Sequence, residues 1–302
     1  MEPNGSKIMS TKDSILCILV MFLWGAQVSV VKIAEMEIPP FFMLALRFLI
    51  IALFTLPFVL KIIKKDFLKI ALITVFVSIL HFGCLYIGIS LVKASTSAIL
   101  YQLSSIFTIL LAIVFLKEKI TMTRAIGVSL SILGVLILFG GFEPHENLLG
   151  GLLIVFASLS FAIGTTLIKK LGPINALTLN GWSAVIAAPA MLVMSFMSED
   201  VNYVLLSNIS IKGWLCVLYT ALIGGVLSFL LWYQLIGRNQ ISRLAPFTLL
   251  TPIFAVLVSQ IVLDETLSLK FICSTLIVLL GVVIAQFGWP KLQSKKVQPE
   301  KV

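Results

Sequence analysis

The stretch SSIFTILLAIVFLKE, residues 104–118, occurs a second time in this chain as TPIFAVLVSQIVLDE, residues 251–265. Both copies run through an apolar segment and end on a glutamate, Glu118 or Glu265, which places them 147 residues apart (265 − 118). The same shift aligns residues of several chemical types: Tyr86 with Tyr233, Ser95 with Ser242, and Gly134 with Gly281. A chance match between leucine-rich helices would not also align these residues, so we interpret the pattern as an internal repeat.

Upstream residues align at a different shift. The segment from Trp24 to Lys32 resembles the segment from Phe161 to Lys169, 137 residues later (169 − 32). The difference of 10 residues (147 − 137) must lie between the segments so aligned. The polar stretch 198–211 is longer than its counterpart 61–66, and we expect the extra residues there.

The composition is that of a membrane protein. The chain has 302 residues, of which 60% are hydrophobic and 12% charged, and its mean hydropathy is +1.12. Apolar runs of about 20 residues indicate membrane-spanning helices, and continuous runs without alternation argue against a barrel. We predict an all-α integral membrane protein with ten transmembrane helices at about 14–34, 40–60, 68–90, 94–116, 123–141, 149–169, 174–197, 212–235, 243–263 and 270–288. The predicted domains are a first five-helix repeat at 14–141, a second at 149–288, and a tail at 289–302.

The basic residues indicate the orientation. Most of them fall in segments on the same side of the membrane as the amino terminus. The segments on the other side hold only Lys32, Lys93, Lys212 and Lys270. By the positive-inside rule both termini are cytoplasmic. Five spans per repeat then make the second repeat inverted, as in secondary transporters that bind substrate between their halves. We expect a multi-pass protein of the inner (plasma) membrane of a bacterium.

Other classes of function find little support. The net charge of +9 is spread over short loops, which argues against nucleic-acid binding. The four cysteines, Cys17, Cys84, Cys216 and Cys273, stand singly in predicted spans, so we expect no metal site and no cofactor. No nucleophile–base pair or HExxH motif suggests an enzyme, and no P-loop suggests direct use of ATP. A non-transporting membrane receptor or an intramembrane enzyme is the less favoured alternative.

Two predicted spans carry matching polar faces. Ser97, Tyr101, Ser104, Ser105 and Thr108 follow helical spacing in the span 94–116. The span 243–263 presents Thr248, Thr251, Ala255 and Ser259 at similar spacing. Such hydroxyls either hydrogen-bond neighbouring helices or line a cavity between the halves, and the repeat favours the cavity.

Several other spans contain polar residues that are costly in lipid. Arg47 is either a buried anchor, which we favour, or a hook for a substrate carboxylate. His81 is a proton carrier or a packed, hydrogen-bonded residue, and both readings stay open. Lys32 is expected to snorkel to the membrane interface. The predicted cavity lining is Trp24, Gln27, His81, Tyr101, Ser105, Thr165, Thr248 and Thr251.

Short motifs in both halves resemble the EamA domain of the drug/metabolite transporter superfamily. They are Trp24-Gly25, Pro39-Pro40, Leu44-x-x-Arg47-Phe48, Leu116-x-Glu118 and Leu133-Gly134-Val135 in the first half, and Ala245-Pro246, Leu249-Leu250-x-Pro252 and Leu263-Asp264-Glu265 in the second. Gly237-Arg238 and Arg243-x-Ala245-Pro246 look closest to bacterial exporters of amino-acid metabolites, of the cysteine and O-acetylserine type. The resemblance implies a ten-helix carrier with a central cavity.

We therefore expect a secondary transporter that exports small polar metabolites, amino acids or their derivatives, by alternating access. The alternative within transport is a carrier of drugs, nucleobases or sugar derivatives. The expected partners are a small-molecule substrate, the lipid bilayer, and protons as the coupling ion with His81 as their carrier.

Overall fold

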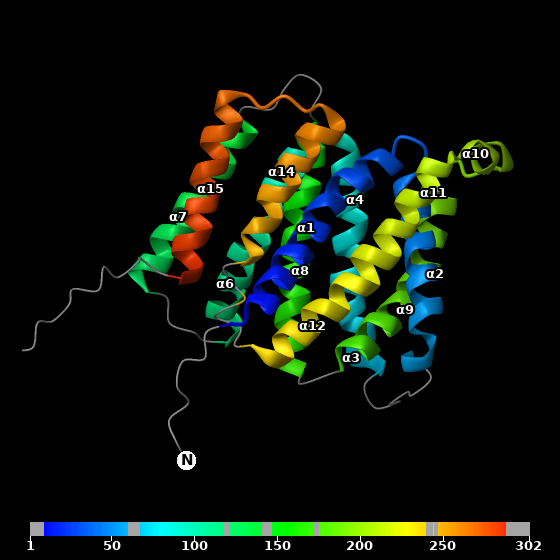
Figure 1. The fold of residues 1–302 in the computed structure, drawn as a ribbon, viewed down its shortest axis with the longest axis horizontal. Coiled ribbons are helices and arrows are strands. Elements are labelled where there is room, and N and C mark those ends of the chain that lie inside the picture. Colours follow the sequence, from blue (N-terminus) through cyan, green and yellow to red (C-terminus); the bar gives the residue numbers. More distant parts are fainter. Residues whose placement is uncertain are drawn as a thin grey trace, which may run out of the picture.

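The computed structural model describes residues 9–59, 67–116, 121–140, 147–171, 175–239, 244 and 247–287, and in these ranges all regular structure is helical. The helices stand side by side in one bundle (Figure 1). The start of α1 (Thr11–Ala34) and the end of α15 (Leu269–Phe287) lie at the same end of it (Figure 1). We call the opposite end, where α1 stops, the distal end. The predicted all-α class is confirmed for the described ranges.

Between α1 and α15 the chain forms a series of helices, two of them π-helical and named η. In order they are α2 Pro40–Val59, α3 Phe67–Thr74, η2 Val75–Leu80, α4 His81–Leu91, α5 Ala94–Leu100, α6 Leu103–Leu116, α7 Met122–Phe139, α8 Leu148–Leu171, α9 Ala176–Ser198, α10 Tyr203–Asn208, α11 Ile211–Leu218, η3 Tyr219–Leu227, α12 Ser228–Arg238 and α14 Leu250–Leu263.

Many of these helices match the dimensions of a bilayer. Among the described residues, 9 helical stretches are long and apolar enough to cross a membrane, and α14 is a shorter apolar helix. The predicted ninth span, 243–263, includes residues 243, 245 and 246, which lie outside the described ranges. Large apolar side chains such as Leu53, Phe196 and Ile261 are exposed on the outside of the bundle. Water would disfavour such a surface, whereas lipid covers it without cost.

The polar segment 94–116 is interrupted, contrary to the single helix expected from its spacing. The chain turns at Tyr101 and Gln102 between α5 and α6, where Gln102 N donates to Ile99 O at 3.1 Å and Ser105 N to Gln102 O at 3.1 Å. These three-residue hydrogen bonds tighten the helix locally. The polar face is therefore divided between two helices. A second turn, at Leu249 before α14, lies at the position that the 147-residue shift aligns with Gln102.

Glycines set the closest helix contacts. A β-carbon added at Gly134 of α7 would lie 2.8 Å from Val278 N of α15. One added at Gly281 of α15 would lie 2.5 Å from Ser131 N of α7. The backbones of α7 and α15 can approach this closely only because these residues lack side chains. Gly134 and Gly281 therefore serve the packing of these two helices. Figure 1 shows α7 and α15 side by side at one edge of the bundle.

At the distal end, charged side chains bind the ends of helices from other segments. The Glu265 carboxylate accepts hydrogen bonds from Ala94 N at 2.6 Å and Ser95 N at 3.0 Å, at the start of α5. Glu265 thus caps the start of α5, while Glu118, its counterpart in the repeat, lies outside the described residues. Lys32, expected to snorkel to the membrane interface, donates its ammonium hydrogens to backbone carbonyls at the end of α4. A cation there offsets the negative end of a helix dipole.

Candidate functional site

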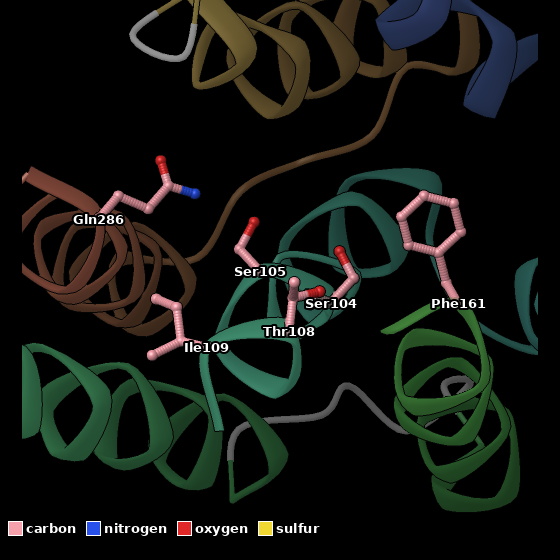
Figure 2. Close-up of a pocket in the computed structure, with 6 residues that line it drawn as sticks. All are labelled: Ser104, Ser105, Thr108, Ile109, Phe161 and Gln286. Carbon is pink, nitrogen blue, oxygen red and sulfur yellow. Dashed lines mark hydrogen bonds between the residues drawn. The ribbon is translucent and has the colours of Figure 1, made fainter. Parts of the chain in front are cut away.

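A polar pocket lies between α6, α8 and α15. Its volume is about 220 Å³, and it is lined by Ser104, Ser105, Thr108, Ile109, Phe161 and Gln286. In Figure 2 the three hydroxyl residues of α6 lie between Gln286 on one side and Phe161 on the other. Four of these six side chains are polar, although the surrounding helices are apolar, so the pocket suits a small polar ligand.

Gln286 supplies the most informative atom of this pocket. Its Oε1 is buried and has no hydrogen-bond partner. A buried amide oxygen without a partner costs free energy, and a ligand that donates a hydrogen bond would recover it. Sequence reasoning missed this residue. The signal was present, since Gln286 is an amide near the end of an apolar span, but nothing in the sequence brings that end of α15 to α6.

The α6 hydroxyls are arranged along one side of the pocket. Thr108 Oγ1 donates to the Ser104 carbonyl at 2.7 Å, one turn earlier. This bond uses the only proton of the threonine hydroxyl and leaves its lone pairs free to accept. Ser105 is half-buried and lines the pocket beside Gln286 (Figure 2). Together these groups offer both donors and acceptors to a ligand.

An aromatic cluster adjoins the pocket through Phe161. The His81 ring lies 5.1 Å from the Phe161 ring, 5.5 Å from that of Tyr101, with which it stacks, and 4.4 Å from that of Phe82. His81 Nδ1 lies 2.9 Å from the Val77 carbonyl oxygen, to which it donates. Its Nε2 is buried without a hydrogen-bond partner. Two residues of the predicted lining, His81 and Tyr101, thus contact Phe161, which lines the pocket together with a third, Ser105.

Arg47 is held away from this pocket. Its side chain is 2% exposed, and Nη1 donates to the Tyr86 hydroxyl at 2.9 Å. The guanidinium also lies over the Phe82 ring, 4.2 Å from its centroid, where the cation meets the negative face of the ring. Its partners are a hydroxyl and an aromatic face rather than backbone carbonyls. Arg47 is thereby anchored between α2 and α4.

Trp24 and Gln27 meet the π-helix η3 rather than the pocket. Trp24 Nε1 donates to the Gly224 carbonyl at 3.2 Å, which lies in η3. Gln27 packs into the space left by the missing side chain of Gly224, since a β-carbon there would overlap its Oε1. The next carbonyl, that of Gly225, accepts from Asn180 Nδ2 at 3.1 Å. The sequence pair Gly224-Gly225 therefore marks a π-helical segment that receives side chains from two other helices.

The three predicted threonines bond locally or elsewhere. Thr165 Oγ1 donates to the Ala162 carbonyl at 3.0 Å within α8. Thr251 Oγ1 contacts the Met21 sulfur at 3.1 Å, on α1. Thr248 is half-buried, one residue before the turn at Leu249. Within the described residues no group of three or more His, Cys, Asp or Glu side chains could hold a metal ion.

Comparisons with known proteins agree with this architecture. A model of the EamA-like transporter family matches residues 12–140 and again residues 148–287. The chain is 29% identical to a Salmonella typhimurium protein named "Probable amino-acid metabolite efflux pump", over 96% of this chain and 99% of that protein. An Escherichia coli protein of the same name is also 29% identical, over 94% and 98%. A crystal structure with 14% identity covers 92% of this chain and 97% of its own, with a TM-score of 0.63. This chain therefore belongs to the EamA-like transporter family and is a multi-pass membrane transporter.

Proposed function

We propose that this protein is a secondary transporter that exports small polar metabolites, amino acids or their derivatives, across the inner (plasma) membrane. The observation that carries the proposal is the pocket between apolar helices that brings together the polar side chains of Ser104, Ser105, Thr108 and Gln286. The relatives named as amino-acid metabolite efflux pumps match nearly the whole chain and support the same substrate class.

The mechanism that we propose is alternating access between two inverted five-helix repeats, 14–141 and 149–288. Two helix interfaces whose residues are aligned by the sequence shifts differ in how closely they pack, which supports alternating access. The contact of α1 with α14 is closed tightly at Gly25, where an added β-carbon would lie 2.7 Å from the Thr251 carbonyl oxygen. The aligned positions, Ala162 of α8 and Ser104 of α6, lie on the two helices between which the pocket opens, and Ser104 lines it. Unequal packing at equivalent interfaces is what two exchanging states require.

The direction follows from the proposed orientation. Gln286 is one residue from the end of α15, at the end of the bundle where α1 begins. With both termini cytoplasmic, the pocket lies in the cytoplasmic half and the distal end faces outward. A polar pocket on that side is suited to load substrate from the cytoplasm, as export requires.

The size of the pocket favours a metabolite over a drug. Drug-sized ligands occupy sites of about 300–1,000 Å³, whereas this pocket measures about 220 Å³. The buried Gln286 oxygen further favours a ligand with a hydrogen-bond donor, such as an amino group. A carrier of drugs, nucleobases or sugar derivatives remains the second candidate because relatives within one superfold differ in substrate.

Counterflow in proteoliposomes tests the proposal. Vesicles loaded with unlabelled amino acids, nucleobases or cationic drugs are assayed for uptake of each labelled compound. We expect saturable exchange of amino acids, with a KM raised by Ser105→Ala and by Gln286→Leu. Ser198→Ala is the matched control, because Ser198 is exposed and bonds only within α9. If only nucleobases or drugs show saturable exchange, the result supports the second candidate instead.

The proposed coupling ion is the proton, with His81 as its carrier. The free Nε2 of His81 lies beside the aromatic wall of the pocket and supports this role. His81→Gln should keep exchange of substrate for substrate but lose uphill export driven by a pH gradient. If transport and its pH dependence are unchanged in this variant, the proton role of His81 is excluded.

A further inference from the structure

Glu35 is the most unusual carboxyl group of the described structure. It directly follows α1, and its backbone N–H bonds to Val31 O and Ile33 O. Both oxygens of its side chain are buried, and neither has a hydrogen-bond partner. The group also lies at the carboxyl end of its own helix, where the dipole is negative. Each of these features opposes a negative charge, and the neutral acid is the form that the site accommodates.

The neighbouring ammonium group of Lys32 compensates a charge on Glu35 only in part. Lys32, one turn earlier on α1, donates to Ile89 O at 2.6 Å, Ser90 O at 2.9 Å and Val92 O at 2.7 Å. These three bonds hold its charge at the end of α4 rather than at the carboxyl group of Glu35. The ammonium stabilises ionised Glu35 only through its field, without a hydrogen bond.

Other charged and titratable groups surround Glu35 on the packed helices. The Glu199 carboxylate after α9 repels a second negative charge. On α4, the Tyr86 hydroxyl lies within the fields of both Glu35 and Arg47, and it receives the Arg47 hydrogen bond itself. Burial raises the pKa of the Glu35 carboxyl well above its usual range; Lys32 opposes this rise and Glu199 adds to it.

Two further carboxylates tie the surrounding helices together. Glu199 accepts from Phe41 N at 2.7 Å and from Phe42 N at 2.9 Å, which joins the end of α9 to the start of α2. Glu37 accepts from Ser210 N and Ser210 Oγ, both at 2.8 Å, which joins the α1–α2 connection to the start of α11. Glu35 is thus enclosed where segments from both halves of the chain are bonded to one another.

We propose that Glu35 is a proton-binding site whose occupation holds the distal end of the bundle closed. Separation of the segments that carry Glu37 and Glu199 from their partners admits water to Glu35. The carboxyl O–H then gives its proton to water and becomes a hydrated carboxylate. Closure takes one proton back. This inference does not rest on the transported substrate, because it concerns only the opening of the distal end.

The sign of the pH dependence follows from linkage. The closed state binds the proton more tightly than the open state, so acid favours closure. Between the usual pKa of a carboxyl group and the raised pKa of Glu35, each pH unit shifts the open-to-closed ratio toward open by up to about tenfold. Below the usual carboxyl range both states are protonated, and the effect vanishes.

Native Cys216 provides a probe of this opening. It lies in α11, is 8% exposed, and packs in the same buried cluster as Ile38 and Phe41, directly under the bonded segments. In a variant with Cys17, Cys84 and Cys273 replaced by Ala, a membrane-impermeant thiol reagent reports its accessibility. The labelling rate is compared between this parent and its Glu35→Gln derivative at each pH, because the ratio cancels the titration of the thiol.

We expect the two rates to agree near the usual carboxyl pKa and the parent to label progressively faster as pH rises, by up to about tenfold per unit. Asp200→Asn, a matched change at an exposed acid beside Glu199, should follow the parent. A ratio that stays constant with pH overturns the proposal. As a second readout, the infrared C=O band of a protonated carboxyl should be present at neutral pH and absent in Glu35→Gln; its absence from the parent also overturns the proposal. Neither readout involves substrate, so both are independent of the counterflow assay.

Discussion

Gly25 of α1 lies against Thr251 of α14 with no room for a side chain between them. A β-carbon at Gly25 would approach the Thr251 carbonyl oxygen to 2.7 Å, Phe254 Cβ to 2.8 Å and Ala255 N to 2.9 Å. Two of these three neighbours are backbone atoms, which cannot rotate away. The contact therefore sets the distance between the two helices.

Gly25→Ala should destabilise the protein by about 1–3 kcal/mol, the usual cost of an extra methyl group in a close-packed core. Gly83→Ala is the matched control, because its added β-carbon would meet only Phe41 Cε1, at 3.4 Å, and Met191 Cε, at 3.8 Å. The control should be neutral or slightly stabilising, since Ala favours helix over Gly. Thermal unfolding in detergent measures both. Equal melting temperatures for the two variants would contradict the packing argument.

Gly224→Ala should act through Gln27. The added methyl group displaces the Gln27 side chain, whose Oε1 occupies that space. A double-mutant cycle with Gln27→Ala isolates this effect, because the methyl group costs nothing once the amide is gone. We expect the double variant to be more stable than the sum of the single changes by about 0.5–3 kcal/mol. Additive losses in thermal unfolding would refute the coupling.

Glu265→Gln should weaken the start of α5. The carboxylate accepts two backbone hydrogen bonds and one from Ser95 Oγ at 2.5 Å, and charge-assisted bonds are about twice as strong as neutral ones. The loss expected for a helix cap is about 0.5–2 kcal/mol. Asp264→Asn serves as the control, because Asn tolerates the left-handed backbone of that position, φ 52°. A control that loses as much stability would show that loop charge, not the cap, is responsible.

We expect the contact between Glu37 and Ser210 at the distal end to be lost at low pH. Hydrogen bonds from Ser210, first from its backbone N–H and then from its hydroxyl, lower the pKa of Glu37 below its usual 4.5. A lowered pKa means that the contact is fully stabilising above the usual value and is lost as pH falls through the lowered value. Glu37→Gln should therefore remove the acid-side fall in melting temperature. If the melting temperature of Glu37→Gln falls at acid pH as much as that of the parent, Glu37 is not the cause of the fall.

Glu35 and Glu37 are two residues apart, but the pKa of Glu35 is raised and the pKa of Glu37 is lowered. Protonation of Glu35 favours closure of the distal end, whereas protonation of Glu37 weakens it. Closure should consequently be strongest at mildly acid pH, between the two transitions. The Cys216 labelling rate of the parent, divided by the fraction of the thiol that is ionised at each pH, should pass through a minimum. A corrected rate that falls steadily to the lowest pH would show that Glu37 does not contribute.

Much of the fold could be predicted from the residue pattern because a lipid bilayer allows few structures to span it. Apolar runs of bilayer length predict helices, and those within the described ranges are confirmed. The aligned glycines Gly134 and Gly281, part of the repeat, lie where two helices pack closely, since only small residues permit such an approach. These features depend on local composition and spacing, which the sequence displays directly.

The site depended on features that the sequence does not display. The spacing of Ser97 to Thr108 suggests one polar face, but the turn at Tyr101 and Gln102 divides it. Of the predicted cavity residues, Ser105 lines the pocket and His81 and Tyr101 stand beside it, while Trp24 and Gln27 meet η3. Gln286 was missed because its role arises only from the approach of α15 to α6.

The sequence by itself determined that this chain is a helical membrane transporter with a duplicated pattern, because hydrophobic length, charge bias and repeated motifs act over short distances. The tertiary structure alone decided which polar groups meet. It left Gln286 Oε1 and both Glu35 oxygens without partners while satisfying Lys32 and Glu199. The physical reason is that burial and hydrogen bonding depend on which helices pack together, and helices equally apolar in sequence can pack in many ways.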